Sequence, residues 1–247
     1  MHIRPATARD IPRLTDITTT SLVDDKTYDY MWPHRHEYPE DNVFWWQLKI
    51  ERHLYDKKAV FLVVETDPED EKAGGTDKAT GPASVVISYI IWERIGCNKD
   101  ARKRFAEKNT WLNVFDSTVA QMRTWSVDKK YQRRDGDPAR LKALDEASDE
   151  VRKEYFSDLT DWWSLELLVT DRNYRRRGAA SRLVRWGMNQ ADIEGLACGV
   201  EASVMGALLY TALGFRKLVT WCVRVPGDDD ELVYDVMRRE PWGLVLR

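Results

Sequence analysis

The chain has 247 residues, of which 43% are hydrophobic and 32% charged, and this composition is ordinary for a globular protein with a proper core. The formal net charge of −3 gives no electrostatic reason to expect binding to nucleic acid. No apolar run reaches the length of a membrane span and the N-terminus has no signal-peptide pattern, so we expect a cytoplasmic protein without a membrane partner.

Short apolar runs in the first part of the chain predict a sheet. Residues 1–5, 59–65 and 83–92 are expected as strands, and the last of these is so continuously apolar that both of its faces should be covered. A helix is predicted after the first strand, and a second one over 41–55.

An aromatic loop interrupted by prolines is predicted over residues 28–41. It holds His34 and His36, a spacing that suggests a metal site, but Glu37 is the only further candidate ligand nearby. We therefore predict a loop and no metal.

The three cysteines lie far apart and form no Cys-x-x-Cys pair. Cys97, Cys198 and Cys222 are predicted to be small buried side chains in a reducing compartment.

Residues 97–161 carry apolar side chains at helical intervals, over 101–124 and again from 138 to 155. Asp137-Pro138 is a good cap and first-turn pair for the second helix. No change in composition marks a linker, so we predict a single domain over 1–247 with a helical insertion at about 97–161. Whether the insertion is a lid or only adds packing stays open at this point.

The stretch after residue 161 predicts a buried strand, a turn of three arginines and a glycine, and a helix. Apolar residues from Ala180 to Ala191 recur at helical spacing. A helix that opens in this way presents unpaired backbone N–H groups and the positive end of its dipole, and Gly178 lets an anion approach closely. The pattern predicts a phosphate cradle, although it matches neither the nucleotide-triphosphate loop nor the dinucleotide fingerprint.

A second motif follows at 200–215. A strand ends in Glu201-Ala202-Ser203, and a short helix carries Tyr210 and closes on Leu213-Gly214-Phe215. The alternating segments 215–225 and 231–238 then predict a closing hairpin.

Together, Arg175-x-x-Gly178-x-Ala180 and the Tyr210 motif resemble the GNAT superfamily of N-acetyltransferases, in a fungal-type small-molecule or protein N-acetyltransferase form. The resemblance implies an α/β (α+β) fold: a mixed central sheet with a splayed parallel strand pair, and helices on both faces. Where many relatives carry an asparagine after the second strand, this chain has Ser203 and Met205.

The resemblance also implies a binding site for acetyl-coenzyme A. The backbone of Leu168, Val169 and Thr170 would bind the pantetheine arm. The pyrophosphate would lie against the loop and helix start formed by Arg175, Arg176, Arg177, Gly178, Ala179, Ala180 and Ser181.

Two proton-transfer roles are expected, one general acid and one general base, and three side chains are candidates for them. In the family, Tyr210 corresponds to the general acid that protonates the departing thiolate. Strand alternation places Ser164, Glu166 and Leu168 on one face, and a carboxylate in this apolar strand is expensive unless it is paired or functional. Glu166 is therefore one candidate base and Glu201, at the end of the neighbouring strand, is the other.

The predicted function is transfer of an acetyl group from acetyl-coenzyme A, the co-substrate, to a primary amine by direct transfer in a ternary complex, without a metal. The amine acceptor is a small molecule or a protein, and the enzyme is expected as a monomer or homodimer. One alternative is a catalytically silent acyl-coenzyme A-binding module of the same fold. A second alternative, binding of nucleic acid through the arginines, is disfavoured by the acidic net charge.

Overall fold

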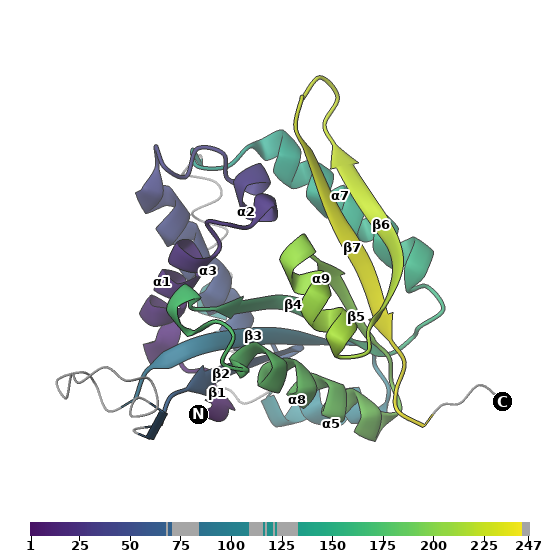
Figure 1. Cartoon of the computed structure of the whole chain (residues 1–247). Helices are drawn as coiled ribbons and strands as arrows, with labels where there is room; N and C mark the ends of the chain where they lie inside the picture. Colours follow the sequence, from purple (N-terminus) through teal and green to yellow (C-terminus); the bar gives the residue numbers. More distant parts are fainter. Residues whose placement is uncertain are drawn as a thin grey trace.

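A computed structural model describes residues 1–67, 69–70, 84–108, 116, 118–120, 122 and 133–243. Seven strands form one sheet in the order β1-β2-β3-β4-β5-β7-β6 (Figure 1). Strands β4 and β5 are parallel, and the other neighbouring pairs of this sheet are antiparallel. The strands are β1 (His2–Pro5), β2 (Ala59–Glu65), β3 (Val86–Ile95), β4 (Trp162–Thr170), β5 (Cys198–Ala202), β6 (Arg216–Arg224) and β7 (Glu231–Arg239).

Helices cover both faces of the sheet, which confirms the predicted fold class. On one face, Leu14, Ile17 and Ile50 are fully buried against β2 and β3. On the other face, Leu183 and Val184 are fully buried in a second apolar cluster. The helices are α1 (Ile11–Ser21), α2 (Lys26–Met31), α3 (Pro39–Tyr55), α5 (Lys99–Lys108), α7 (Pro138–Tyr155), α8 (Ala179–Glu194) and α9 (Val204–Ala212), with 3₁₀ turns η1 (Ala8–Asp10) and η2 (Arg172–Tyr174).

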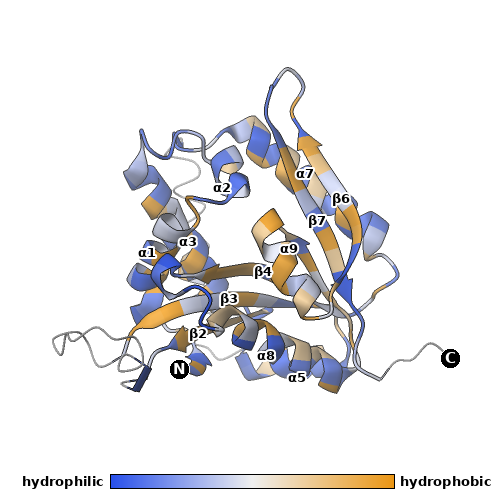
Figure 2. Ribbon diagram, in the orientation of Figure 1, coloured by the Kyte–Doolittle hydropathy of each residue, from blue (hydrophilic) through white to orange (hydrophobic). Residues whose placement is uncertain are grey.

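The central strands are apolar because they are covered on both sides. The first seven residues of β3 are all buried, and so are the first six of β2. Figure 2 shows the same contrast, with hydrophobic residues along the sheet and hydrophilic residues on the outer faces of the helices. The strands predicted over 59–65 and 83–92 and the closing hairpin are confirmed.

Close packing fixes α8 on the sheet. A Cβ atom added to Gly187 would overlap the Trp92 ring, so the absence of a side chain lets the helix approach β3. Trp92 is itself fully buried and meets the edge of Trp163 at 6.4 Å between ring centres. This packing sets where the N-terminus of α8 lies relative to β4.

The parallel pair β4–β5 separates after three residue pairs. Trp163, Ser164 and Leu165 pair with β5, and the residues after Leu165 do not. On the other edge of β4 the register with β3 shifts, so that Leu165 pairs with Trp92, Leu167 pairs with Ile91, and Glu166 has no partner. The predicted splay is confirmed.

The bulge in β4 also changes the face of the strand on which Leu168 lies. Leu168 packs on the α8 side together with Trp163 and Leu165, whereas Leu167 and Val169 pack on the α1 and α3 side. Leu168 therefore does not share a face with Ser164. The prediction from simple alternation was wrong because the extra residue at the bulge changes the phase of the strand.

In its described parts the insertion contains helices, and α5 and α7 pack on different parts of the fold. In α5, Arg104 contacts Gln190 and Glu194, so this helix lies beside α8 (Figure 1). Helix α7 instead packs against β6 and β7 through Ala147 and Val151. Most of the segment 109–132, where the rest of the first predicted helix would fall, lies outside the described residues.

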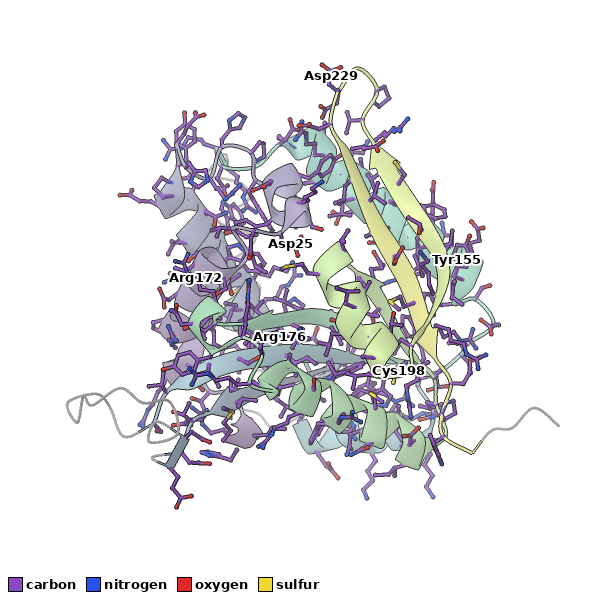
Figure 3. The ribbon with its side chains drawn as sticks, in the orientation of Figure 1. Asp25, Tyr155, Arg172, Arg176, Cys198 and Asp229 are labelled. Atoms are coloured by element: carbon purple, nitrogen blue, oxygen red, sulfur yellow. The ribbon has the colours of Figure 1, made fainter. Side chains whose placement is uncertain are left out.

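Two expectations drawn from composition concern burial and membranes. Cys198 on β5 (Figure 3) is buried as predicted, but Cys97 and Cys222 are exposed, since each lies outside the apolar clusters. Within the described ranges, no helix combines the length and the apolar character needed to cross a bilayer.

Candidate active site

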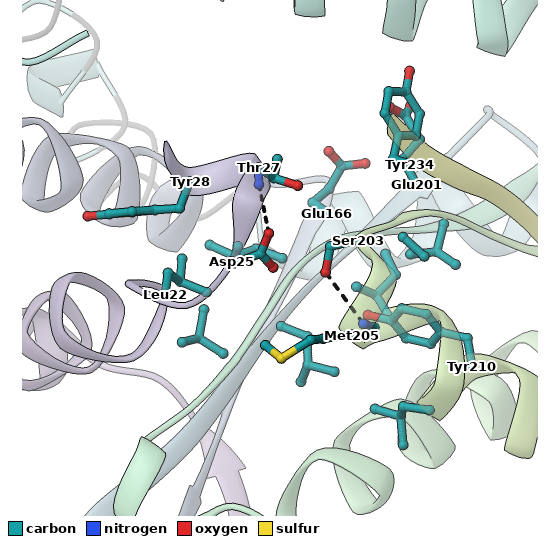
Figure 4. Close-up of a pocket in the computed structure, with 18 of the residues that line it drawn as sticks. Leu22, Asp25, Thr27, Tyr28, Glu166, Glu201, Ser203, Met205, Tyr210 and Tyr234 are labelled. Atoms are coloured by element: carbon teal, nitrogen blue, oxygen red, sulfur yellow. Dashed lines mark hydrogen bonds between the residues drawn. The ribbon is translucent and has the colours of Figure 1, made fainter. Parts of the chain in front are cut away.

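One cavity of about 1100 Å³ lies where β4 and β5 separate. Its walls come from the splayed strands, from α2, α3 and α9, and from α7 of the insertion. Figure 4 shows Glu166, Glu201 and Tyr210 among the residues that line it. The predicted site residues that line it are Glu166, Leu168, Val169, Thr170, Arg175, Arg176, Gly178, Ala179, Ala180, Ser181, Glu201 and Tyr210. The structure thus brings residues from both sequence motifs to one enclosure.

The predicted phosphate cradle has the geometry of an anion site. Gly178 is the N-cap of α8 with φ 84° and ψ 0°, and Arg176 is also left-handed with φ 65°. A Cβ atom added to Gly178 would meet no protein atom within 4 Å, so the space above the glycine is open. The first amides of a helix have no intrahelical acceptor and lie at the positive end of the dipole.

The three arginines of this loop have different surroundings. Arg175 forms an ion pair with Asp24 at 2.6 Å and also donates to the Ser21 carbonyl, which braces the loop against the end of α1. Arg176 is exposed at the cavity. Arg177 is not among the lining residues, and its guanidinium lies 4.9 Å from the centre of the Tyr174 ring.

Tyr210 lies on α9 with only 5% of its surface exposed. Its ring packs on Phe215 with 5.6 Å between ring centres, and it also lines the cavity. Burial raises the pKa of the phenol, so the hydroxyl is protonated at neutral pH. The side chain therefore meets the requirements of a packing anchor and those of a proton donor.

Glu201 is a half-buried carboxylate at the end of β5. It accepts a hydrogen bond from Ser148 Oγ of α7 at 2.7 Å. Burial raises the pKa of this carboxyl, and the Ser148 hydrogen bond opposes the rise. A general base works best when its pKa lies near the operating pH, so a raised pKa makes this carboxylate better suited to that role near neutral pH.

Glu166 stands at the bulge of β4, facing α3 and α7. Arg152 Nη2 lies 3.4 Å from Glu166 Oε1. Lys49 of α3 also lines the cavity; burial lowers the pKa of this ammonium, and the charge of Glu166 raises it. Glu166 is thus a paired carboxylate, one of the two alternatives left open by the sequence.

The region where relatives carry an asparagine is occupied differently here. Ser203 is the N-cap of α9 and accepts a hydrogen bond from the Gly206 amide at 3.4 Å, and Met205 follows it (Figure 4). Both residues line the cavity.

Two further walls of the cavity come from side chains that were not among the predicted site residues. One contains Tyr28, Trp32 and Trp46, whose rings pack together with centres 4.9–6.2 Å apart. The other is a face of α7 formed by Leu144, Asp145, Ser148, Asp149 and Arg152. The high tryptophan content and the aromatic loop were the available signals for the first wall, whereas the α7 residues resemble an ordinary solvated helix face.

The predicted loop around His34 carries no metal-binding cluster. His34 Nδ1 lies 3.5 Å from Oε1 of Glu37, which is three residues away in the chain. In the parts of the chain that the structure describes, no three or more His, Cys, Asp or Glu side chains are placed to hold a metal ion.

Comparisons with known proteins identify acetyltransferases as similar proteins. No protein-family model matches the chain. It is 23% identical over 229 residues to a protein from Stachybotrys chartarum named "Acetyltransferase". The aligned region covers 92% of this chain and 85% of that protein.

Two solved structures have a similar fold. One, from Corynebacterium glutamicum, is described as "histone acetyltransferase HPA2 and related acetyltransferase". Its TM-score is 0.54 at 20% identity, and the match covers 97% of this chain and 95% of that one. The other is an arylalkylamine N-acetyltransferase 7 from the yellow fever mosquito, with a TM-score of 0.55, 10% identity and coverage of 96% and 86%.

Proposed function

We propose that this chain, a member of the GNAT superfamily of N-acetyltransferases, transfers the acetyl group of acetyl-coenzyme A directly to a primary amine in a ternary complex. The observation that carries the proposal is that residues of the predicted phosphate-binding loop, Tyr210 and both candidate bases line one cavity. Direct transfer requires both substrates in one enclosure with the reacting atoms in contact, and a cavity of about 1100 Å³ has room for both.

The splayed strand and the helix start would hold the cofactor. Beyond Leu165, the β5-facing edge of β4 has no strand partner, so the peptide groups of Leu168 to Thr170 are free on that side to bind the pantetheine arm. The open space above Gly178 and the first amides of α8 would take the pyrophosphate. Acetyl-coenzyme A supplies the activated acyl group as its thioester.

The proton steps are assigned to groups already in suitable states. Glu201 takes the proton of the attacking amine, since burial raises the pKa of its carboxyl toward the working range of a base. Tyr210 gives its proton to the departing thiolate, and burial keeps its phenol protonated by raising its pKa. Glu166, which is paired with Arg152, is assigned to orient the amine.

A two-step experiment tests this function. A thermal-shift measurement with acetyl-coenzyme A should show stabilisation, because a ligand that binds only the folded state raises the melting temperature. An amine screen that reads free thiol should then show turnover. Stabilisation without thiol release from any amine would instead support a silent acyl-coenzyme A-binding module.

The proposed location of the enzyme is the cytoplasm.

A further inference from the structure

We infer that Ser148 of α7 and Tyr234 of β7 are positioning residues, which hold the Glu201 carboxylate in the orientation and charge state that proton transfer requires. The inference rests on the proposed function, because that function assigns Glu201 as the base. Both residues act through Glu201 and neither exchanges a proton with the amine. Helix α7 belongs to the insertion, so the inserted segment completes the site of the base.

The contact between Ser148 and Glu201 joins the insertion to the central sheet. Ser148 Oγ donates to Glu201 Oε2 at 2.7 Å, and both residues line the cavity. The neighbouring Ala147 and Val151 of α7 are buried in a cluster with residues of β6 and β7, so apolar packing fixes where the serine hydroxyl lies. Because this bond uses Oε2, Oε1 can accept the proton of the amine.

The register of the sheet brings Tyr234 to the same carboxylate. Glu201 of β5 pairs with Val236 of β7, and Tyr234 lies two residues before Val236, on the same face of the strand. Diagonal neighbours across two strands are within reach of an aromatic side chain. Tyr234 is 4% exposed and lines the cavity, and Figure 4 shows it beside Glu201. Its hydroxyl is thus a second neutral donor at the base.

The titratable and charged groups around Glu201 have opposing effects. Burial raises the pKa of this carboxyl, and the hydrogen bond from Ser148 is the largest effect that lowers it. The charge of Arg152 and the Tyr234 hydroxyl also lower the pKa, whereas the charge of Glu166 raises it. Arg152 and Glu166 are paired with each other at 3.4 Å, so their charges partly cancel at Glu201. The other charged residues that line the described part of the cavity are Asp25, Lys49, Asp145, Asp149, Arg175 and Arg176.

Neutral donors suit a general base better than an ion pair does. A hydrogen bond to the charged form favours ionisation, and a directly paired cation adds its full charge to that effect and lowers the affinity for a proton further. Burial raises the pKa of the Tyr234 phenol and the charge of Glu201 raises it further, so the phenol stays a protonated donor. Glu201 therefore keeps the proton affinity that burial gives it and remains ionised and oriented.

The test is the pH profile of kcat/KM, measured with one amine for all proteins so that ionisation of the amine is the same in every profile. Ser148→Ala removes a hydrogen bond to the ionised base and should move the basic limb to higher pH by about one unit. On the limb this is a loss of about tenfold in kcat/KM, which is recovered at higher pH. Tyr234→Phe keeps the ring and should move the limb in the same direction.

Two further variants serve as controls. Ser148→Thr retains a hydroxyl and should restore the limb to the wild-type position. Ser157→Ala makes the same chemical change just after α7, where the side chain is exposed and is not among the lining residues, so its profile should equal that of the wild type. Melting temperatures of all variants show that they are folded.

An unchanged limb in Ser148→Ala or in Tyr234→Phe would overturn the assignment of that residue. An equal loss of activity at every pH would do the same, because it is the result expected of a packing role. Acetyl transfer by the wild type would stand in both cases.

If no amine is acetylated, the proposed function fails and the inference is tested without turnover. The readout is then an NMR titration of protein labelled at its glutamate carboxyl carbons, in which the Glu201 signal is the one missing from Glu201→Gln. This signal should titrate at higher pH in Ser148→Ala and in Tyr234→Phe than in the wild type. Identical titration in the wild type and a variant would overturn the assignment of the residue changed.

Discussion

Gly178 is the position at which a single substitution best separates ligand binding from folding. It caps α8 with φ 84°, and a Cβ atom added there would meet no protein atom within 4 Å. Gly178→Ala therefore costs only the left-handed backbone conformation, about 1–2 kcal/mol. For a chain of this size that corresponds to a fall in melting temperature of roughly 2–8 °C.

Gly178→Asp has the same backbone cost as Gly178→Ala and also introduces a negative charge at the loop. Two unit charges about 4 Å apart repel by about 4 kcal/mol at an effective dielectric constant of about 20, and solvent at this exposed loop reduces the effect. We expect affinity for acetyl-coenzyme A, measured by calorimetry, to fall by about tenfold or more relative to Gly178→Ala, which is about 1.4 kcal/mol or above. Equal affinity of the two folded variants would refute the assignment of this loop to the pyrophosphate.

Three further predictions follow from the site and the core. Tyr210→Phe keeps the ring packing but removes the proton, so kcat should fall by about 10²-fold with cofactor affinity nearly unchanged; normal turnover would leave the residue as an anchor only. Because burial raises the pKa of Glu201, activity should fall with decreasing pH as this base becomes protonated, and at a higher pH than for a free carboxyl group. Glu201→Gln should abolish that limb of the rate profile and Glu166→Gln should keep it; the reverse outcome would exchange their roles. Gly187→Ala should destabilise the protein by about 1–3 kcal/mol in a denaturant titration, because its methyl group would overlap the buried Trp92 ring; an unchanged midpoint would show that α8 shifts freely.

Features that depend on local periodicity could be predicted from the sequence. The strand over 162–170 and helix α8 were predicted because buried residues such as Leu183 and Val184 recur at the intervals that the core requires. The glycine of the cradle was predicted because a left-handed position before a helix strongly favours it, and Gly178 does have φ 84°.

Features that depend on contacts between distant segments could not be predicted. The bulge at Glu166 exists only in the register of β4 with β3, so alternation within the strand alone placed Leu168 on the wrong face. The inner face of α7 is polar, with Asp145 and Ser148, and a polar helix face looks the same in a sequence whether it meets solvent or a cavity.

Product analysis tests the central claim most directly. Purified protein is incubated with acetyl-coenzyme A and a panel of primary amines, and free thiol and acetylated amine are quantified in the same samples by absorbance and mass spectrometry. The account predicts one acetylated amine for each thiol released, with the Gly178→Asp variant impaired at cofactor concentrations that saturate the wild type. Tight binding of acetyl-coenzyme A without an acetylated product from any amine would contradict it.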